Sequence, residues 1–139
     1  MLRNPTLVEV ARRNQVSDTI SHRVHPVSEY GKRGLLTRLL KSGEINQCIV
    51  FVRTKQGCSR LARALSHAGI KADAIHGDKS QSERMKALNA FKNGEIQTLV
   101  ATDVAARGID IDELPFVVNY ELPHTPEDYV HRIGRTVFH

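Results

Sequence analysis

Short apolar runs alternate with amphipathic helical patterns along this chain, and this alternation constrains its fold more than any other feature. Each run is continuous and partly β-branched, as expected for a strand that is covered on both faces. The runs are Cys48 to Val52, Ala72 to Ile75, Thr98 to Ala101 and Phe116 to Tyr120. Strands that alternate with helices indicate a parallel sheet with helices on its faces, so the predicted fold class is α/β.

The helical patterns between the runs have clear ends and apolar stripes. A capping-box spacing, Ser80 to Glu83, opens one helix, and Gly43, Gly69 and Gly94 stand where three helices end. Spacing of three and four residues predicts which helical side chains face the core. These are Leu35, Leu36, Leu39, Leu40, Leu61, Ala64, Leu65, Ala68, Met85, Leu88 and Phe91.

The first 17 residues show no complete helix or strand period, and we interpret residues 1–17 as the tail of an interdomain linker. Residues 18–139 then form one domain, which is large enough to bury a core without disulfides or metal. Thr19 to Val27 alternates weakly and contains Pro26, which is typical of a strand near a sheet edge. No apolar run has the length of a membrane span, so we expect a cytoplasmic protein with no membrane partner.

The net charge of +5 is unevenly distributed. Residues 1–70 hold 12 Lys and Arg against 4 Asp and Glu, whereas residues 71–139 hold 8 against 11. The basic excess favours a polyanionic partner, although a solvated surface is the alternative for Arg12, Arg13, Lys32 and Arg33. Cys48 and Cys58 lack the paired spacing of a zinc site, so we expect structural thiols and no bound metal.

Polar side chains gather where the predicted strands end. Because parallel connectivity brings these ends to one edge of the sheet, residues remote in sequence converge there. Four groups do so: Arg53 with Thr54, Gln81 with Arg84, the stretch from Thr98 to Ile111, and His131 to Thr136. Arginines with hydroxyl and amide partners suit the recognition of phosphate groups.

Together these segments resemble the conserved motifs of the second RecA-like domain of DEAD-box ATP-dependent RNA helicases. The matching motifs are Ile49 to Thr54, His76-Gly77-Asp78 with Gln81 and Arg84, Ala101 to Asp110, and Tyr129 to Thr136. The resemblance extends from about residue 18 to residue 136, and Val118 to Pro123 is most similar to the bacterial RhlE subgroup. It implies a three-layer RecA-like domain of the P-loop NTPase type with a mostly parallel sheet.

The resemblance also implies roles for individual residues. Asp110 matches the residue that holds the ATP ribose, Arg135 an arginine finger at the γ-phosphate, and Gly108 lies beside this nucleotide site. His131 and Arg132 match residues that connect the motif to the other domain's catalytic carboxylates, so with Arg135 they form the catalytic set. The expected RNA-binding residues are Arg53, Thr54, Gly77, Gln81, Arg84, Thr102, Asp103 and Arg107. Helix capping is the alternative role for Asp103.

Two departures from the family pattern limit what this chain does alone. It has neither a Gly-x-x-x-x-Gly-Lys-Ser/Thr loop nor an Asp-Glu-Ala-Asp tetrad, and Phe138 stands where the family has a second arginine finger. We therefore expect a fragment that is truncated within its last motif, lacks the last strand and has no ATPase activity alone.

In the complete protein we expect RNA unwinding or ribonucleoprotein remodelling, coupled to the hydrolysis of ATP with Mg²⁺. The expected partners are single-stranded or duplex RNA, bound with little sequence preference, and the N-terminal RecA-like domain, which would hold the Mg²⁺. The alternative is a non-enzymatic RNA-binding or partner-docking module on the same scaffold.

Overall fold

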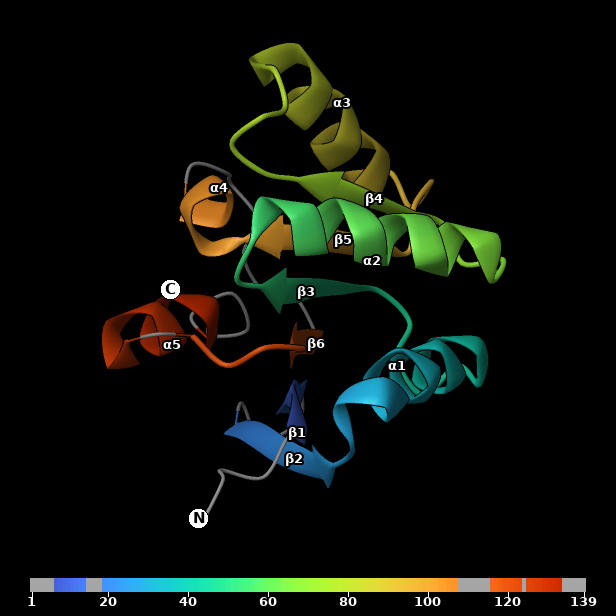
Figure 1. The fold of residues 1–139 in the computed structure, drawn as a ribbon, viewed down its shortest axis with the longest axis vertical. Coiled ribbons are helices and arrows are strands. Elements are labelled where there is room, and N and C mark those ends of the chain that lie inside the picture. Colours follow the sequence, from blue (N-terminus) through green and yellow to red (C-terminus); the bar gives the residue numbers. More distant parts are fainter. Residues whose placement is uncertain (1–6, 15–18, 108–115, 124, 134–139) are drawn as a thin grey trace.

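A six-stranded sheet in the order β2-β1-β6-β3-β5-β4 forms the centre of the fold (Figure 1). The computed structural model describes residues 7–14, 19–107, 116–123 and 125–133. Its strands are β1 (Leu7–Asn14), β2 (Thr19–Pro26), β3 (Cys48–Val52), β4 (Ala72–Ile75), β5 (Thr98–Thr102) and β6 (Phe116–Asn119). Its helices are the 3₁₀ turn η1 (Glu29–Gly31), α1 (Lys32–Lys41), α2 (Lys55–His67), α3 (Gln81–Lys92), α4 (Asp103–Arg107) and α5 (Pro126–Ile133).

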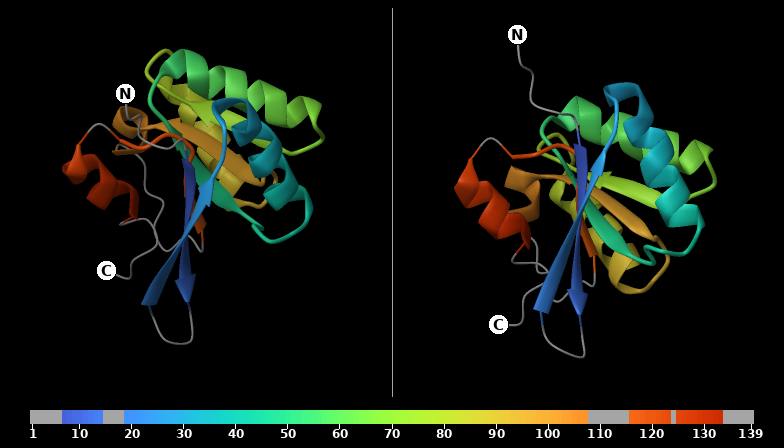
Figure 2. Two further views of the ribbon diagram at one scale, coloured as in Figure 1. Left: turned by 60° about the horizontal axis from the view of Figure 1, so that its bottom comes forward. Right: turned by 90° about the horizontal axis from the view of Figure 1, so that it is seen from below.

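Four neighbouring strands, β6, β3, β5 and β4, run parallel, and β1 runs antiparallel to both β2 and β6. In the centre, Val50 of β3 is opposite Val100 of β5 and Val118 of β6. The carboxyl ends of the parallel strands therefore lie along one edge of the sheet. Figure 2 shows that β1 and β2 form a twisted ribbon that extends past the neighbouring strands.

Alternate side chains of each strand enter two different cores. Cys48, Val50 and Val52 pack with α1 and α2 on one face, whereas Ile49 and Phe51 pack with α3 and α4 on the other. This alternation follows from the two-residue period of a strand. It produces the three layers that the sequence predicts.

Several local predictions are confirmed. β2 lies at the sheet edge, Ser80 and Glu83 form the capping box, and the three predicted helix-ending glycines have positive φ angles. Cys48 and Cys58 are buried, and burial raises the pKa of both thiols to about 12. Within the described residues, no helix has the length and apolarity needed to cross a membrane.

Other predictions are wrong. Residues 1–17, interpreted as the tail of an interdomain linker, contain β1, which lies inside the sheet with Val8 and Val10 buried because β2 and β6 both pair with it. Met85 was predicted to face the core but is 42% exposed, and the buried residues of α3 are Ala87, Leu88 and Phe91. Lys32 is 6% exposed rather than solvated, because its Nζ donates to the Tyr120 carbonyl oxygen at 2.9 Å.

Candidate functional site

Arg132 of α5 is the largest fully buried side chain in the described structure, with 1% of its surface exposed. Its Nε donates to Oδ1 of Asp103 at 2.6 Å, and its Nη2 donates to Oδ2 at 2.7 Å. A two-pronged pair of this kind combines ionic attraction with a fixed orientation. The pair fastens α5 to the start of α4, directly after β5.

The other contacts of Arg132 connect α5 to β6, to Glu121 just after β6, and to β3. Nη1 donates to Oδ1 of Asn119 at 3.0 Å and to the carbonyl oxygen of Glu121 at 2.6 Å. The guanidinium also lies 4.9 Å from the centroid of the Phe51 ring, within range of a cation–π interaction. Every nitrogen of the guanidinium therefore has a partner inside the domain.

A carboxylate on β1 extends this arrangement to the antiparallel strand next to β6. Glu9 accepts from Nδ2 of Asn119 at 2.8 Å and from the Tyr129 hydroxyl at 3.1 Å. Burial, together with the hydrogen bond to Glu9, raises the pKa of Tyr129 to about 12, so the hydroxyl stays protonated. We call the set of Glu9, Asp103, Asn119, Tyr129 and Arg132 the Arg132 network.

Sequence reasoning missed two members of the Arg132 network, Glu9 and Asn119. A lone carboxylate between the apolar residues Val8 and Val10 was the available signal for Glu9. Such a charge on a buried strand needs a partner, because burying an unpaired carboxylate is costly. Nothing in the sequence indicates that the partners come from β6 and α5.

Gly77, Gln81 and Arg84 form a second region, which we call the Arg84 edge. The capping box starts α3, so Gln81 and Arg84 lie in its first turn, where free amides favour an anion. Nη2 of Arg84 reaches the Gly77 carbonyl oxygen only at 3.5 Å, and its Nε is buried without a hydrogen-bond partner among the described residues. Arg84 therefore has donors that the domain itself does not use.

His76 precedes the Arg84 edge at the end of β4. Its Nδ1 accepts from the Asp78 backbone amide at 3.2 Å, so Nε2 carries the proton and donates to Oγ of Ser59 at 2.7 Å. Burial lowers the pKa of His76, and the positive charge of Lys79 lowers it further. The ring is thus neutral at pH 7 and supports the loop that leads to Gly77.

The other predicted site residues in the described structure differ in their exposure and in their hydrogen-bond or ion-pair partners. Arg53 is exposed at the end of β3 and its Nε donates to the Leu122 carbonyl oxygen at 2.6 Å, while Thr54 caps α2 by accepting from Gly57. Thr102 is buried at the end of β5. Arg107 forms an ion pair with Asp128, and His131 is exposed on α5.

These residues do converge as the sequence predicts. Arg53, Thr54, Gly77 and Thr102 all lie at or just after the carboxyl ends of β3, β4 and β5. Asp103 pairs with Arg132, which the helix-capping alternative did not anticipate. Gly108, Asp110 and Arg135 lie outside the described residues. Within the described part of the chain, no group of three His, Cys, Asp or Glu residues could hold a metal ion.

A family model described as the helicase conserved C-terminal domain matches residues 31–137. The chain is 44% identical over 135 residues to the ATP-dependent RNA helicase DbpA of Bacillus subtilis, which covers 97% of this chain and 28% of that protein. It is 46% identical over 135 residues to the DEAD-box ATP-dependent RNA helicase CshA of Geobacillus kaustophilus, with coverages of 97% and 29%. The chain thus spans less than a third of these two relatives.

Solved structures give the same result for the fold. A DEAD box protein from Methanococcus jannaschii superposes with a TM-score of 0.73 and 50% identity, over 79% of this chain and 30% of that chain. Dbp5 of S. cerevisiae, in a structure bound to RNA and ADP BeF3, superposes with a TM-score of 0.68 and 37% identity, over 78% and 29%. The predicted RecA-like α/β fold is therefore confirmed.

Proposed function

The chain belongs to the helicase conserved C-terminal domain family found in DEAD-box ATP-dependent RNA helicases, and from this we propose that it supplies the RNA-backbone-binding half of such an enzyme. The complete protein would couple ATP hydrolysis to RNA unwinding or ribonucleoprotein remodelling. The sequence details at Val118 to Pro123 support membership of the bacterial RhlE-like subgroup. We also propose that the protein acts in the cytoplasm.

One observation carries this proposal: Arg84 has a buried and unpartnered Nε in the first turn of α3. A phosphate of RNA offers the oxygen acceptors that this guanidinium lacks within the domain. Gly77 and Gln81 lie beside it, and Arg53, Thr54 and Thr102 continue the surface along the strand ends. Because these contacts address phosphate rather than bases, we expect binding with little sequence preference.

On the nucleotide side, we propose that Gly108, Asp110 and Arg135 contact ATP when the N-terminal RecA-like domain closes on this one. Mg²⁺ would be held by that other domain and would supply charge neutralisation on the phosphates. Arg135 comes two residues after the end of α5. Arg132 holds α5 through its buried contacts, so its proposed part is to position this segment, while His131 remains exposed for contact with the other domain. Asp103 and Arg107, which the resemblance assigns to RNA binding, form ion pairs with Arg132 and Asp128 of α5, so we propose that they also orient α4 against α5.

The test is RNA binding by the 139-residue chain, measured by fluorescence anisotropy with a labelled single-stranded oligonucleotide at increasing KCl. We expect Arg84→Ala to weaken binding for every sequence tried and to reduce the slope of log K against log salt by about one. Lys92→Ala is the matched control, because Lys92 is an exposed cation at the opposite end of α3. An unchanged slope for Arg84→Ala would remove Arg84 from the RNA path.

A non-enzymatic RNA-binding or docking module on this scaffold is the second candidate. The Arg84 edge would serve that function equally well, so RNA binding does not separate the two. RNA-stimulated ATP hydrolysis by the full-length protein does, because only the helicase requires it.

A further inference from the structure

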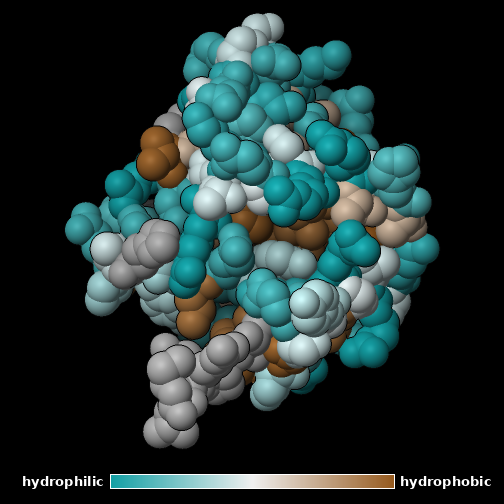
Figure 3. Space-filling model, viewed as in Figure 1, coloured by the Kyte–Doolittle hydropathy of each residue, from teal (hydrophilic) through white to brown (hydrophobic). Residues whose placement is uncertain are grey.

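A groove between α1 and α2 has features that neither the proposed RNA site nor the proposed nucleotide site explains. It has a volume of about 490 Å³ and is lined by Arg33, Thr37, Arg60, Arg63, Ala64, His67 and Ala68. Figure 3 shows the surface hollowed between these helices, with hydrophobic atoms on the floor and hydrophilic atoms around them. The groove lies on the sheet face covered by α1 and α2, whereas α3 with the Arg84 edge packs on the other face.

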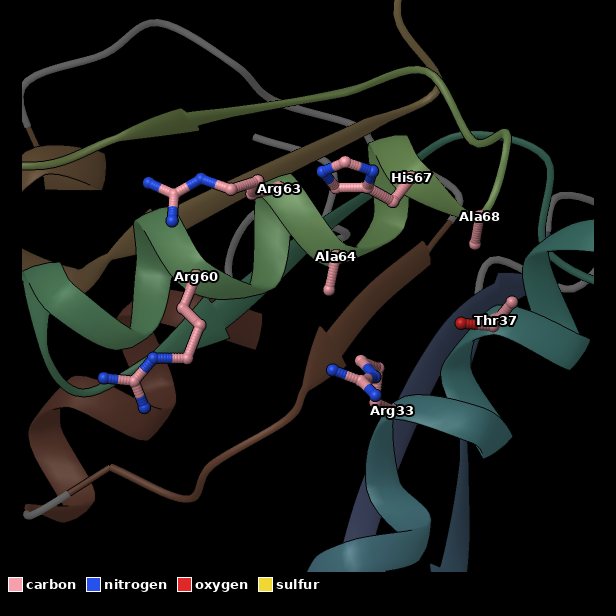
Figure 4. A pocket seen from close by; sticks show the side chains of 7 residues that line it. All are labelled: Arg33, Thr37, Arg60, Arg63, Ala64, His67 and Ala68. Carbon is pink, nitrogen blue, oxygen red and sulfur yellow. The ribbon is translucent and has the colours of Figure 1, made fainter.

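The floor of the groove departs from the pattern expected of α2. Ala64 and Ala68 belong to the apolar stripe that predicts burial, yet both are only half-buried, while Leu61 and Leu65 of the same stripe are buried. In Figure 4, Ala64 and Ala68 point from α2 toward Arg33 and Thr37 of α1. Their small side chains leave the space between the helices open, so apolar surface stays accessible there.

The rim of the groove is cationic, and its arginines have no acidic partner among the described residues. Arg60, Arg63 and His67 line the groove from α2 at a spacing of three and four residues, and all three are exposed. In Figure 4, Arg60 extends on the side of α2 that faces Arg33 of α1, whereas Arg63 and His67 lie on the other side of the helix. None of the described residues that line the groove is acidic. Among the described residues, Arg33, Arg60 and Arg63 make no ion pair and no side-chain hydrogen bond, in contrast to Arg107 and Arg132.

We propose that this groove docks an acidic peptide segment of a partner protein, with one or two apolar side chains seated against Ala64 and Ala68. Charge complementarity fixes the sign of the partner, because three arginines surround the groove. The apolar floor favours a peptide over RNA, since Leu or Phe side chains bury more apolar surface against alanine methyl groups than a ribose–phosphate backbone does. Among the described residues that line the groove, none is aromatic and able to stack on an RNA base.

The test uses the 139-residue chain with isotope-labelled alanine methyl groups, observed by NMR. The probe is a 12-residue peptide of Asp and Glu that carries a Leu and a Phe four residues apart. We expect the methyl signals of Ala64 and Ala68 to shift on titration, while those of Ala87 and Ala105, buried on the other face, stay in place.

Two double variants and one altered peptide test the roles of the rim and of the floor. Arg60→Glu combined with Arg63→Glu is expected to weaken peptide binding about tenfold or more, since it reverses two rim charges. Lys86→Glu combined with Lys92→Glu makes the same charge change on exposed positions of α3 and should leave binding within about twofold. A peptide with Ser in place of Leu and Phe should bind clearly more weakly than the original.

Three outcomes overturn the proposal. The first is no shift of Ala64 and Ala68 at peptide concentrations up to about 1 mM, the weak end of specific affinity. The second is equal binding of the Ser-containing peptide, which would make the groove a purely ionic surface. The third is a shift of these two methyl groups by a single-stranded RNA oligonucleotide in preference to the peptide. None of these results depends on Arg84, so this proposal and the proposed RNA site can fail separately.

Discussion

The Arg132 network and the Arg84 edge each centre on an arginine at the same side of the sheet, but the two guanidiniums are used in opposite ways. Arg132 has four hydrogen bonds to Asp103, Asn119 and Glu121, whereas Arg84 has one contact at 3.5 Å and an unpartnered Nε. The two arginines therefore differ in how many donors remain available to a ligand. From this difference we propose that Arg84 binds RNA, whereas Arg132 holds elements of the domain together.

The largest effect should come from removing the buried guanidinium. Arg132→Met keeps much of the apolar stem but leaves the Asp103 carboxylate and Asn119 without their partner. Breaking a buried ion pair on one side typically costs about 3–5 kcal/mol, and we expect a loss of that size in the free energy of unfolding measured with urea. Arg107→Ala, which breaks the exposed pair with Asp128, should cost no more than about 1 kcal/mol. Equal losses for both variants would contradict the claim that the contacts of Arg132 stabilise the domain more than an exposed ion pair does.

A smaller effect is expected at the far end of the Arg132 network. Glu9→Gln keeps the shape of the side chain but weakens its two accepted hydrogen bonds, from Asn119 and Tyr129. Hydrogen bonds to charged groups contribute about 1.5–3 kcal/mol, and we expect a loss at the lower end of this range because one acceptor oxygen remains. Glu44→Gln, on an exposed residue, is the control. If the two variants unfold at the same urea concentration, β1 does not take part in holding α5.

The smallest effect concerns His76, which supports the Arg84 edge. Its pKa is lowered in the folded state from the ordinary value of 6.5, so below that pH the unfolded chain binds a proton that the native ring resists. Stability should therefore fall as the pH drops below about 6.5 and should be unaffected by His76 above it. His76→Gln should flatten the decline between about pH 7.5 and pH 5.5, whereas His67→Gln, on an exposed residue, should not. A decline that persists in His76→Gln would show that another group causes it.

Much of the fold could be predicted from the sequence, because the strands are covered on both faces and read as continuous apolar runs. Cys48–Val52 and Ala72–Ile75 have the predicted bounds, and the capping box and the glycine-ended helices follow from local backbone chemistry. β1 was missed because its apolar part is short and ends in Arg12 and Arg13. Its place in the sheet depends on pairing with β6, more than 100 residues later.

The candidate site was predictable in its membership but not in its internal contacts. Parallel connectivity is sufficient to bring Arg53, Gly77 and Thr102 to one edge. Whether Asp103 caps a helix, binds a ligand or pairs with Arg132 depends on how α5 packs, and no local pattern encodes that. The groove between α1 and α2 was hidden for the same reason, since Ala64 and Ala68 have the spacing of core residues.

We propose that the guanidinium of Arg84 has donors available for RNA, whereas every guanidinium nitrogen of Arg132 already has a partner within the domain. Both arginines carry an Nε–H group that gives its own signal in an ¹H–¹⁵N NMR spectrum of the chain. On addition of a single-stranded RNA oligonucleotide, we expect the Arg84 Nε–H signal to shift and the Arg132 signal to stay in place. A shift of the Arg132 signal with an unmoved Arg84 signal would contradict it.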